Sequence, residues 1–211
     1  MTQPETQDAP PARRTRLSPE ARKQEVLAEA ILYFADEGFD GGTRGLAKRM
    51  GITQPLLYRY FPSKDDLVNE VYRAVYLDRW QNGWEDTIRD RSLPIDTRLH
   101  RFYQSYTSTV FDRNWLRIFF FAGLKGLDLN ARYLQRVESV LLAPIWAETS
   151  AAFGQPAPTA TGTHDLVWQM HGAIFYHGIR QQIYGDRSVS IDRTIALAID
   201  TYLGAAKAAL A

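Results

Sequence analysis

Residues 42–64 read Gly-Thr-Arg-Gly-Leu-Ala-Lys-Arg-Met-Gly-Ile-Thr-Gln-Pro-Leu-Leu-Tyr-Arg-Tyr-Phe-Pro-Ser-Lys. The pattern predicts two short helices joined by a turn at Gly51, followed by the start of a third helix. Thr53 can cap the second helix, and Pro55 is tolerated in its first turn because the N–H that proline lacks would be unbonded there anyway. This is the layout of a helix-turn-helix, which places one helix in the major groove of DNA.

The second short helix divides into an inner and an outer face. Leu57 and Phe61 point inward, towards the inner face of the first short helix, made by Leu46, Ala47 and Met50. The positions left to face outward are Gln54, Leu56, Tyr58, Arg59 and Tyr60. Packing alone explains so many outward aromatic and hydrogen-bonding groups poorly, so the pattern favours a surface that binds a partner.

Composition and charge narrow the class of protein. The chain has 211 residues, 45% of them apolar and 23% charged, which is ordinary for a soluble globular protein. It has no cysteine, which excludes disulfides, thiolate metal sites and thiol redox sensing. The net charge is only +1, yet residues 11–64 carry ten Lys or Arg against six Asp or Glu. Positive charge therefore gathers around the helix-turn-helix, as neutralisation of DNA phosphates requires.

Hydrophobic segments that would direct the chain to a membrane are not evident. Residues 1–16 contain no apolar block, and the longest hydrophobic run, around Ile118–Leu124, is far shorter than a membrane span. We therefore expect a cytoplasmic protein without a membrane partner.

The remainder of the chain predicts further helices and no strand, so the expected fold class is all-α. Ser18-Pro19-Glu20 starts a helix that Gly38 ends, and Ser63 caps a helix that runs to about residue 82. Later helices are expected over 94–112, 115–125, 128–152 with a kink or break at Pro144, 164–184 and 191–210. Residues 154–163 are the clearest loop.

The first seventeen residues, 1–17, are expected to form a disordered basic arm, because they are rich in Pro, Gln, Thr and Arg without periodicity. Its three arginines are Arg13, Arg14 and Arg16. They either reach the minor groove or the phosphates of DNA, or remain solvated charges.

Four motifs follow one another between residues 20 and 70: Phe-Ala-Asp-Glu-Gly-Phe (34–39), Leu-Ala-Lys-Arg-Met-Gly-Ile-Thr (46–53), Leu-Tyr-Arg-Tyr-Phe (57–61) and Ser-Lys-Asp-Asp-Leu (63–67). Their order and spacing resemble the TetR/AcrR family of bacterial one-component regulators. The last two motifs at this separation are much more specific than a bare helix-turn-helix. The resemblance implies an N-terminal three-helix helix-turn-helix DNA-binding domain at 18–66 and a helical ligand-binding and dimerisation domain at 67–211.

The resemblance also places the contacts with a double-stranded DNA operator on Thr43, Arg44, Gln54, Pro55, Leu56, Tyr58, Arg59, Tyr60 and Lys64. In the family, Thr43 and Arg44 would meet phosphate or a base, while Tyr58 and Lys64 would hold the phosphate backbone. The alternative for Tyr58 and Tyr60 is packing against the first helix.

Chemistry supports base contacts from the second short helix. Gln54 can bond an adenine edge, Arg59 a guanine edge, and Leu56 can touch a thymine methyl. Leu56 is bulkier than the residue common there in the family, so base preference does not transfer from relatives. Gly45 is a second departure, because glycine inside a helix costs about 1 kcal/mol relative to alanine.

Aromatic residues crowd the chain after the DNA-binding segment, and most of them must form ordinary helix packing. Tryptophan and phenylalanine also line apolar ligand pockets. The resemblance implies a pocket for a small hydrophobic or aromatic effector, and our candidates for its lining are Trp84, Phe102, Tyr106, Phe120, Trp146, Trp168, His171 and Phe175.

The last two helices are expected to form the surface of a homodimer, because in the family they pair with their copies as a four-helix bundle. The helix 191–210 combines large and small apolar residues, namely Ile191, Ile195, Ile199, Tyr202, Ala196, Ala198, Gly204, Ala205 and Ala208. Gly172 and Gly178 would permit close approach in the other helix. Two-fold symmetry then requires a near-palindromic operator with half-sites about 34–36 Å apart or a multiple of this.

The expected function is therefore a homodimeric, ligand-responsive transcriptional regulator, most simply a repressor released from its operator by the effector. An enzyme is disfavoured because no nucleophile–base pair, metal cluster or phosphate loop stands out. His164 and His171 lie two turns apart, or about 10 Å along a helix, too far to share a metal, so we expect no metal and no cofactor. The remaining alternative is a DNA-binding regulator or architectural protein without an effector, whose operator complex no metabolite would dissolve.

Overall fold

The computed structural model describes residues 18–156 and 165–211, and these residues form helices with no strand among them. The all-α prediction is confirmed. The predicted basic arm and His164 lie outside the described residues, as does most of the predicted loop 154–163.

The helix-turn-helix prediction is confirmed in its elements. They are α1 (Pro19–Glu37), α2 (Gly42–Arg49), α3 (Gln54–Tyr58) and α4 (Lys64–Tyr72). The predicted caps form: the side chains of Ser18, Thr53 and Ser63 each accept a hydrogen bond from a backbone N–H in the first turn of α1, α3 and α4. Gly38 ends α1 at a φ of 71°, which favours glycine.

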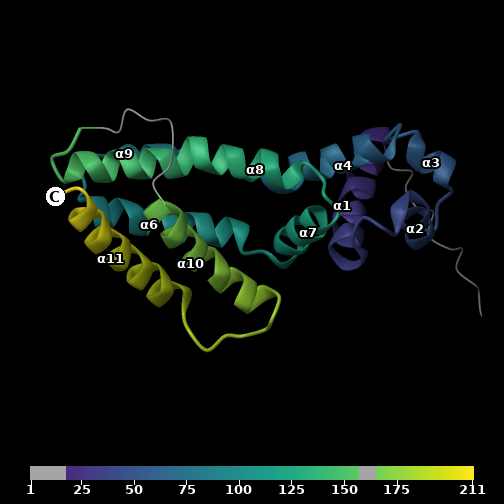
Figure 1. Cartoon of the computed structure of the whole chain (residues 1–211). Helices are drawn as coiled ribbons and strands as arrows, with labels where there is room; N and C mark the ends of the chain where they lie inside the picture. Colours follow the sequence, from purple (N-terminus) through teal and green to yellow (C-terminus); the bar gives the residue numbers. More distant parts are fainter. Residues whose placement is uncertain (1–17, 157–164) are drawn as a thin grey trace, which may run out of the picture.

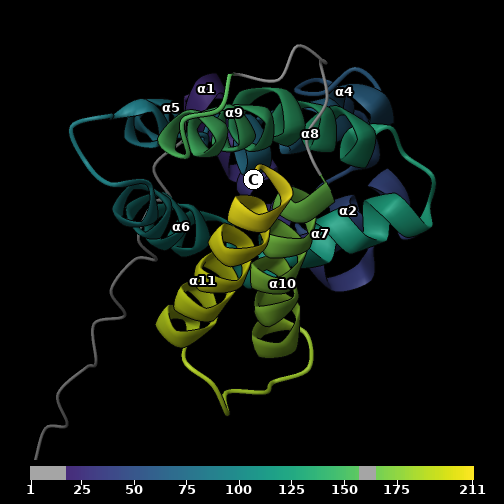
Figure 2. The same ribbon diagram turned by 60° about the vertical axis from the view of Figure 1, so that its left-hand side comes forward.

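We call helices α1 to α4 the head. The helices behind it form the larger part of the molecule. They are the π-helical turn η1 (Arg73–Leu77), α5 (Gly83–Arg89), α6 (Ile95–Val110), α7 (Arg113–Leu124), α8 (Leu129–Val137), the π-helical turn η2 (Glu138–Leu142), α9 (Ala143–Ala152), α10 (Asp165–Gln182) and α11 (Ile191–Ala209). Figure 1 shows an elongated molecule with α2 and α3 at one end and the C-terminus at the other. Figure 2, turned by 60°, shows α10 and α11 lying side by side.

One predicted boundary is wrong. The helix expected to run from Ser63 to about residue 82 loosens into the π-helical turn η1 and stops there, since α4 and η1 end at Leu77. A separate helix, α5, starts at Gly83. Trp80 lies in the connection and packs edge-on to Trp84, with 5.3 Å between ring centroids. The apolar stripe therefore continues across a break between two helices rather than along one helix.

The kink expected at Pro144 takes the form of a helix distortion. Helix α8 passes into the π-helical turn η2, and α9 begins at Ala143 with Pro144 in its first turn. Proline has no N–H to donate to the preceding turn, so a wider turn just before it accommodates the missing bond.

Gly45 allows α1 and α2 to approach closely. A Cβ atom built at Gly45 would lie 2.0 Å from the hydroxyl oxygen of Tyr33, and one built at Gly41 would lie equally close. The Tyr33 ring is buried. The helix-weakening glycine of the sequence therefore makes room for a side chain of α1.

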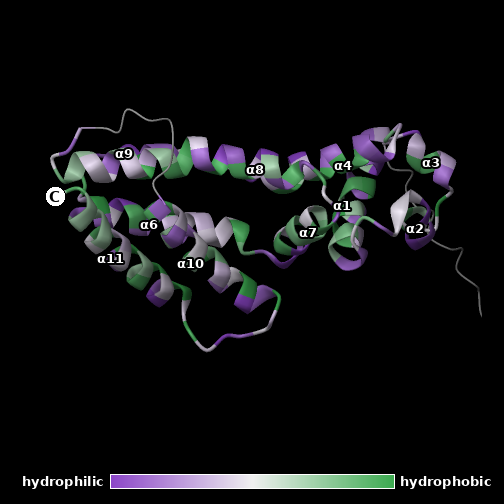
Figure 3. Ribbon diagram, in the orientation of Figure 1, coloured by the Kyte–Doolittle hydropathy of each residue, from purple (hydrophilic) through white to green (hydrophobic). Residues whose placement is uncertain are grey.

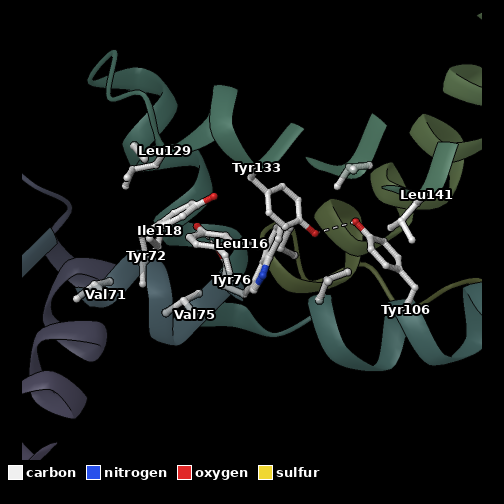
Figure 4. Close-up of a cluster of buried hydrophobic side chains, with 14 of the residues drawn as sticks. Val71, Tyr72, Val75, Tyr76, Tyr106, Leu116, Ile118, Leu129, Tyr133 and Leu141 are labelled. Atoms are coloured by element: carbon white, nitrogen blue, oxygen red, sulfur yellow. Dashed lines mark hydrogen bonds between the residues drawn. The ribbon is translucent and has the colours of Figure 1, made fainter. Parts of the chain in front are cut away.

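A core of aromatic rings joins α6, α7 and α8 to η1. Figure 4 shows Tyr76, Tyr106 and Tyr133 among buried aliphatic side chains. The hydroxyls of Tyr106 and Tyr133 lie 3.0 Å apart and share a hydrogen bond. Since buried hydroxyls need partners, this bond satisfies both at once.

Hydropathy alternates along most helices, with apolar residues in patches rather than in one continuous block (Figure 3). Within 18–156 and 165–211, no helix combines the length and apolarity needed to cross a bilayer.

Candidate nucleic-acid interface, domain junction and effector core

Helix α3 presents the outward face that the sequence predicts. Leu57 and Phe61 are fully buried, so the opposite side of the helix is directed away from the core. Pro55 and Arg59 on that side are exposed, while Leu56 and Tyr60 are partly buried. Figure 1 places α3 at the tip of the molecule, where nothing of the described chain covers it.

Three of the predicted DNA-contact residues meet in one hydrogen-bonded cluster. The hydroxyls of Thr43 and Tyr58 lie 2.9 Å apart, and the Gln54 side-chain amide donates to the Thr43 hydroxyl at 2.9 Å. Thr43 is buried. The Thr43 hydroxyl therefore fixes the orientation of the Tyr58 and Gln54 side chains.

Arg44 and Lys64 lie at the start of α2 and of α4, and both are exposed. The Lys64 ammonium donates to the backbone carbonyl of Phe39 at 2.9 Å, which draws the start of α4 to the connection between α1 and α2. An ammonium has two further donors, so Lys64 can hold this carbonyl and a phosphate together.

Sequence reasoning missed the residues that join the head to the rest of the protein. They recur every four positions on α7: Arg113, Arg117, Phe121, and then Lys125 just beyond its end. The Arg117 guanidinium donates to the carbonyls of Ala35 and Asp36 in the last turn of α1. The available signal was the spacing of Arg113, Arg117 and Lys125, which are four and eight positions apart in and just after a largely apolar helix.

The ring of Phe121 completes this junction. It lies under the Arg117 guanidinium, 5.2 Å from its centre, and against Gly38, where an added Cβ would come within 3.0 Å of the ring. Lys125 pairs with the Asp40 carboxylate. Helix α7 therefore contacts the end of α1 and the turn that follows it.

Asp36 connects three helices. Its carboxylate receives Arg49 of α2 and Arg113 of α7, each at 3.1 Å, and Arg49 also pairs with Glu29 at 2.6 Å. The hydrogen bonds from Arg49 and Arg113 lower the pKa of Asp36. The group stays ionised near neutral pH and holds the two arginines at the domain junction.

Most of the residues predicted to bind an effector lie close together, but their rings pack directly against one another. Trp84 lies 5.2 Å from Tyr106, Tyr106 lies 5.5 Å from His171, and His171 stacks on Phe175 at 6.3 Å between ring centroids. Phe102 and Trp168 contact members of this set. Phe120 reaches Phe175 only through Phe119.

Burial divides this effector core, defined as the eight residues named in the sequence analysis, into two parts. Its buried members are Trp84, Phe102, Tyr106, Trp146 and His171. Its partly buried members are Phe120, Trp168 and Phe175. Burial lowers the pKa of His171 to about 4, so its ring is neutral near pH 7 and lies 3.4 Å from the Tyr103 hydroxyl.

Three hollows in the described part of the chain lie away from the effector core. One of about 680 Å³ follows the outer face of α10 and α11, one of about 260 Å³ lies beside Arg98, and one of about 380 Å³ lies beside Phe111. None of these three includes a residue of the effector core.

The outer face of α10 and α11 is apolar, and it carries only part of the expected residues. Ile195 and Ile199 are buried inside the protomer, and Gly178 is buried against Phe111, whose ring a Cβ would approach to 2.6 Å. These residues therefore pack within the chain. The groove on the outer face is lined by three expected residues, Ala198, Tyr202 and Ala205, together with Leu166, Met170, Ala173 and Leu197, among others.

Fold and site together define a helix-turn-helix unit, α1 to α4, with a larger helical part behind it. Residues 26–71 match the model of the bacterial regulatory proteins of the tetR family. The match falls on α1 to α4, the helices that carry the predicted DNA contacts.

Two curated relatives are similar to parts of the chain. The HTH-type transcriptional regulator LuxR of Vibrio harveyi is 30% identical over 113 residues, covering 51% of this chain and 52% of the relative. The HTH-type transcriptional repressor KstR2 of Mycolicibacterium smegmatis is 32% identical over 89 residues, covering 42% of this chain and 43% of the relative. The chain thus spans about half the length of these relatives, both of which are named as transcriptional regulators.

Solved structures resemble nearly the whole chain. A TetR-like transcriptional regulator from Rhodococcus sp. RHA1 superposes with a TM-score of 0.65 at 19% identity, covering 89% of this chain and 96% of the other. A TetR family regulator from Pseudomonas syringae pv. tomato gives 0.60 at 18% identity, covering 87% and 95%. At these identities the likeness shows the fold.

Proposed function

We propose that this protein is a homodimeric transcriptional repressor that binds a near-palindromic DNA operator in the cytoplasm and is released by a small hydrophobic or aromatic effector. The observation that carries the proposal is the outer side of α3. This side faces away from the core because Leu57 and Phe61, on the opposite side, are buried. The relative KstR2 is a transcriptional repressor, which supports the choice of repression.

The DNA contacts follow from the chemistry of the head. Arg59 is exposed on α3 and offers a forked pair of donors to a guanine edge, while Leu56 offers an apolar surface to a thymine methyl. Arg44 and Lys64 contribute charge to phosphate, which sets affinity rather than sequence preference. Gln54 at the start of α3 and Tyr58 at its end are oriented by Thr43 and add further contacts.

Dimerisation through α10 and α11 explains why an apolar groove lies on their outer face. Leu197 is 65% exposed in the single chain, and burying such a side chain against a second copy is favourable. A two-fold axis there would present two α3 helices to half-sites about 34–36 Å apart or a multiple of this.

Effector binding would require the effector core to open. The partly buried rings of Phe120, Trp168 and Phe175 are the members through which a ligand would enter, since the others are covered. An effector that prefers the opened form by about 1–3 kcal/mol lowers operator affinity roughly 5–150-fold. The alternative, a DNA-binding regulator without an effector, is favoured by the close mutual packing of these rings.

Selection of binding sites from random duplex DNA tests the proposal. We expect the full chain to enrich a near-palindrome with sequence-specific affinity, and a panel of hydrophobic compounds to contain at least one that dissolves the complex. Titration of tryptophan fluorescence with the same panel reports binding near Trp84 and Trp168. Failure to enrich any sequence would refute the regulator, whereas a specific complex that no compound dissolves would support the effector-free alternative.

A further inference from the structure

A small hollow lies at the end of the molecule away from α2 and α3. It has a volume of about 260 Å³ and opens between the α5–α6 connection and the last turn of α9. Figure 1 shows α9 at this end. Its polar lining is Arg91, Arg98 and Glu148, and its apolar lining includes Leu93, Ile95 and Ala151.

Arg91 and Glu148 form a two-bond fork at this hollow. The Nε and Nη2 atoms of Arg91 donate to the two carboxylate oxygens of Glu148 at 2.9 and 3.0 Å. The hydrogen bond from Arg91 is the largest cause that lowers the pKa of Glu148. Glu148 is therefore ionised and carries one negative charge.

Arg98 forms fewer hydrogen bonds than its guanidinium group can donate. Its Nη1 atom donates to the carbonyl of Ile88 and to a carboxylate oxygen of Glu148, both at 2.9 Å. Its Nε atom is buried without a hydrogen-bond partner, and no acceptor for Nη2 is found in the described part of the chain. The same Nε–Nη2 edge in Arg91 grips a carboxylate, so Arg98 has an unused edge of the kind that binds carboxylates.

The unused edge of Arg98 is unusual because the side chain is buried. Only 4% of the Arg98 surface is exposed, and donors that are buried without partners are costly. Among the residues that line the hollow, two guanidinium groups face one carboxylate; the exposed Asp90 carboxylate lies nearby but does not line it.

The start of α6 adds positive potential. No side chain caps this 16-residue helix, and Pro94 and Ile95 at its start line the hollow. Unbonded first-turn N–H groups and the helix dipole favour an anion there. Asp96, the acidic residue of that turn, is exposed and does not line the hollow.

We propose that this hollow binds a small carboxylate, whose oxygens accept hydrogen bonds from Nε and Nη2 of Arg98. The apolar body of the ligand lies against Leu93, Ile95 and Ala151. The carboxylate of the ligand, beside that of Glu148, balances the charge of the second guanidinium and accepts the hydrogen bonds that Arg98 does not otherwise make. The site is independent of the effector core and of DNA binding.

Calorimetric titration of the full chain, without DNA, tests the site with three probes: sodium hexanoate, sodium benzoate and inorganic phosphate at constant ionic strength. We expect saturable binding of at least one carboxylate. Arg98→Lys keeps a charge but removes the forked edge, and its affinity for that carboxylate should fall at least about tenfold. Ala151→Phe fills the hollow without touching the ion pairs, so it should abolish binding.

Ala131→Phe, at an exposed position of α8, is the matched control and should bind like the wild type. Circular dichroism melting establishes which variants fold, and Ala151→Phe decides the question if Arg98→Lys does not. No saturable carboxylate binding, or binding undiminished in Ala151→Phe, overturns the proposal. Binding of phosphate alone, lost in Ala151→Phe, would also overturn the carboxylate assignment.

Discussion

The guanidinium of Arg117 donates a hydrogen bond to the backbone carbonyl of Ala35, which joins α7 to the last turn of α1. The last carbonyls of a helix have no partner within the helix and must find donors elsewhere. Here an arginine from behind the head supplies the donor, and it also reaches the Asp36 carbonyl. Arg117 is therefore one of the α7 side chains that fix the position of α1 relative to the helices behind it.

Replacing Arg117 by methionine should lower the free energy of unfolding by about 1–3 kcal/mol, because two partly buried carbonyls lose a charged donor. Urea unfolding followed by circular dichroism measures this change. Arg187→Met is the control, since Arg187 is exposed, and its effect should stay within about 0.5 kcal/mol. Equal effects of the two variants would show that the Arg117 contacts contribute nothing specific.

Gly45→Ala should destabilise the head although alanine is the better helix former. The new Cβ would meet the Tyr33 hydroxyl at 2.0 Å, and overpacking of this kind costs about 1–3 kcal/mol. Adding Tyr33→Phe removes the clashing oxygen and should recover part of the loss. Gly83→Ala, where nothing lies within 4 Å of the added Cβ, serves as the control in the same melting experiment. If Gly45→Ala is as stable as the wild type, Tyr33 does not determine the packing of α2.

Leu197→Glu should convert the proposed dimer to monomers, because it places a charge on the apolar groove of α10 and α11. Sedimentation equilibrium gives the molecular mass in solution, and operator affinity should fall together with dimerisation. Leu124 is 84% exposed on α7, so Leu124→Glu tests whether a new charge alone has this effect. A Leu197→Glu variant that stays dimeric would place the interface elsewhere.

Arg59→Ala and Lys64→Gln should weaken DNA binding in different ways. Loss of a base-reading Arg59 should cost about 1–3 kcal/mol on the selected operator and relax preference at one base pair. Loss of a phosphate-binding Lys64 should weaken all sequences alike and reduce the slope of log affinity against log salt by about 1. Fluorescence anisotropy with matched and scrambled duplexes at several salt concentrations separates the two. The assignments fail if the two variants show the same pattern.

The buried ring of His171 should make the protein less stable in mild acid. Burial lowers its pKa to about 4, while an unfolded histidine titrates near 6.5. Between these values the unfolded chain binds the extra proton, so the contribution of His171 is fully present above about pH 6.5 and is lost as pH falls towards 4. Urea unfolding of the wild type and His171→Gln at pH 7 and pH 5 should show a smaller loss in the variant. His100→Gln, at a partly exposed ring, should behave like the wild type; an unchanged loss in His171→Gln would contradict the assignment.

Local patterns in the sequence were sufficient for the elements of the head. Ser18, Thr53 and Ser63 cap helices by bonds within three residues, and Leu57 and Phe61 are buried because their spacing puts them on one face. Such features depend on neighbours a few positions away. The all-α class and the resemblance to the tetR family over residues 26–71 follow from them.

Contacts between distant segments needed the coordinates. The spacing of Val71, Val75 and Trp80 is the same for one long helix as for two helices with a break between them, so only the coordinates show that η1 ends at Leu77 and α5 begins at Gly83. The inward direction of Ile195 and Ile199 likewise depends on the helices against which α11 packs. An apolar side chain buried within a protomer and one that would be buried between two copies look alike in sequence.

By itself, the order of residues determined which segments are helical, where most of them begin, and which short helix has an outer face suited to DNA. The tertiary structure alone decided that Tyr33 fills the space left by Gly45, that Arg117 donates to the last turn of α1 from 82 positions away, and that Arg98 keeps an unused edge. The physical reason is range: helix propensity and capping act within one or two turns, whereas burial and hydrogen-bond satisfaction depend on what the folded chain brings alongside.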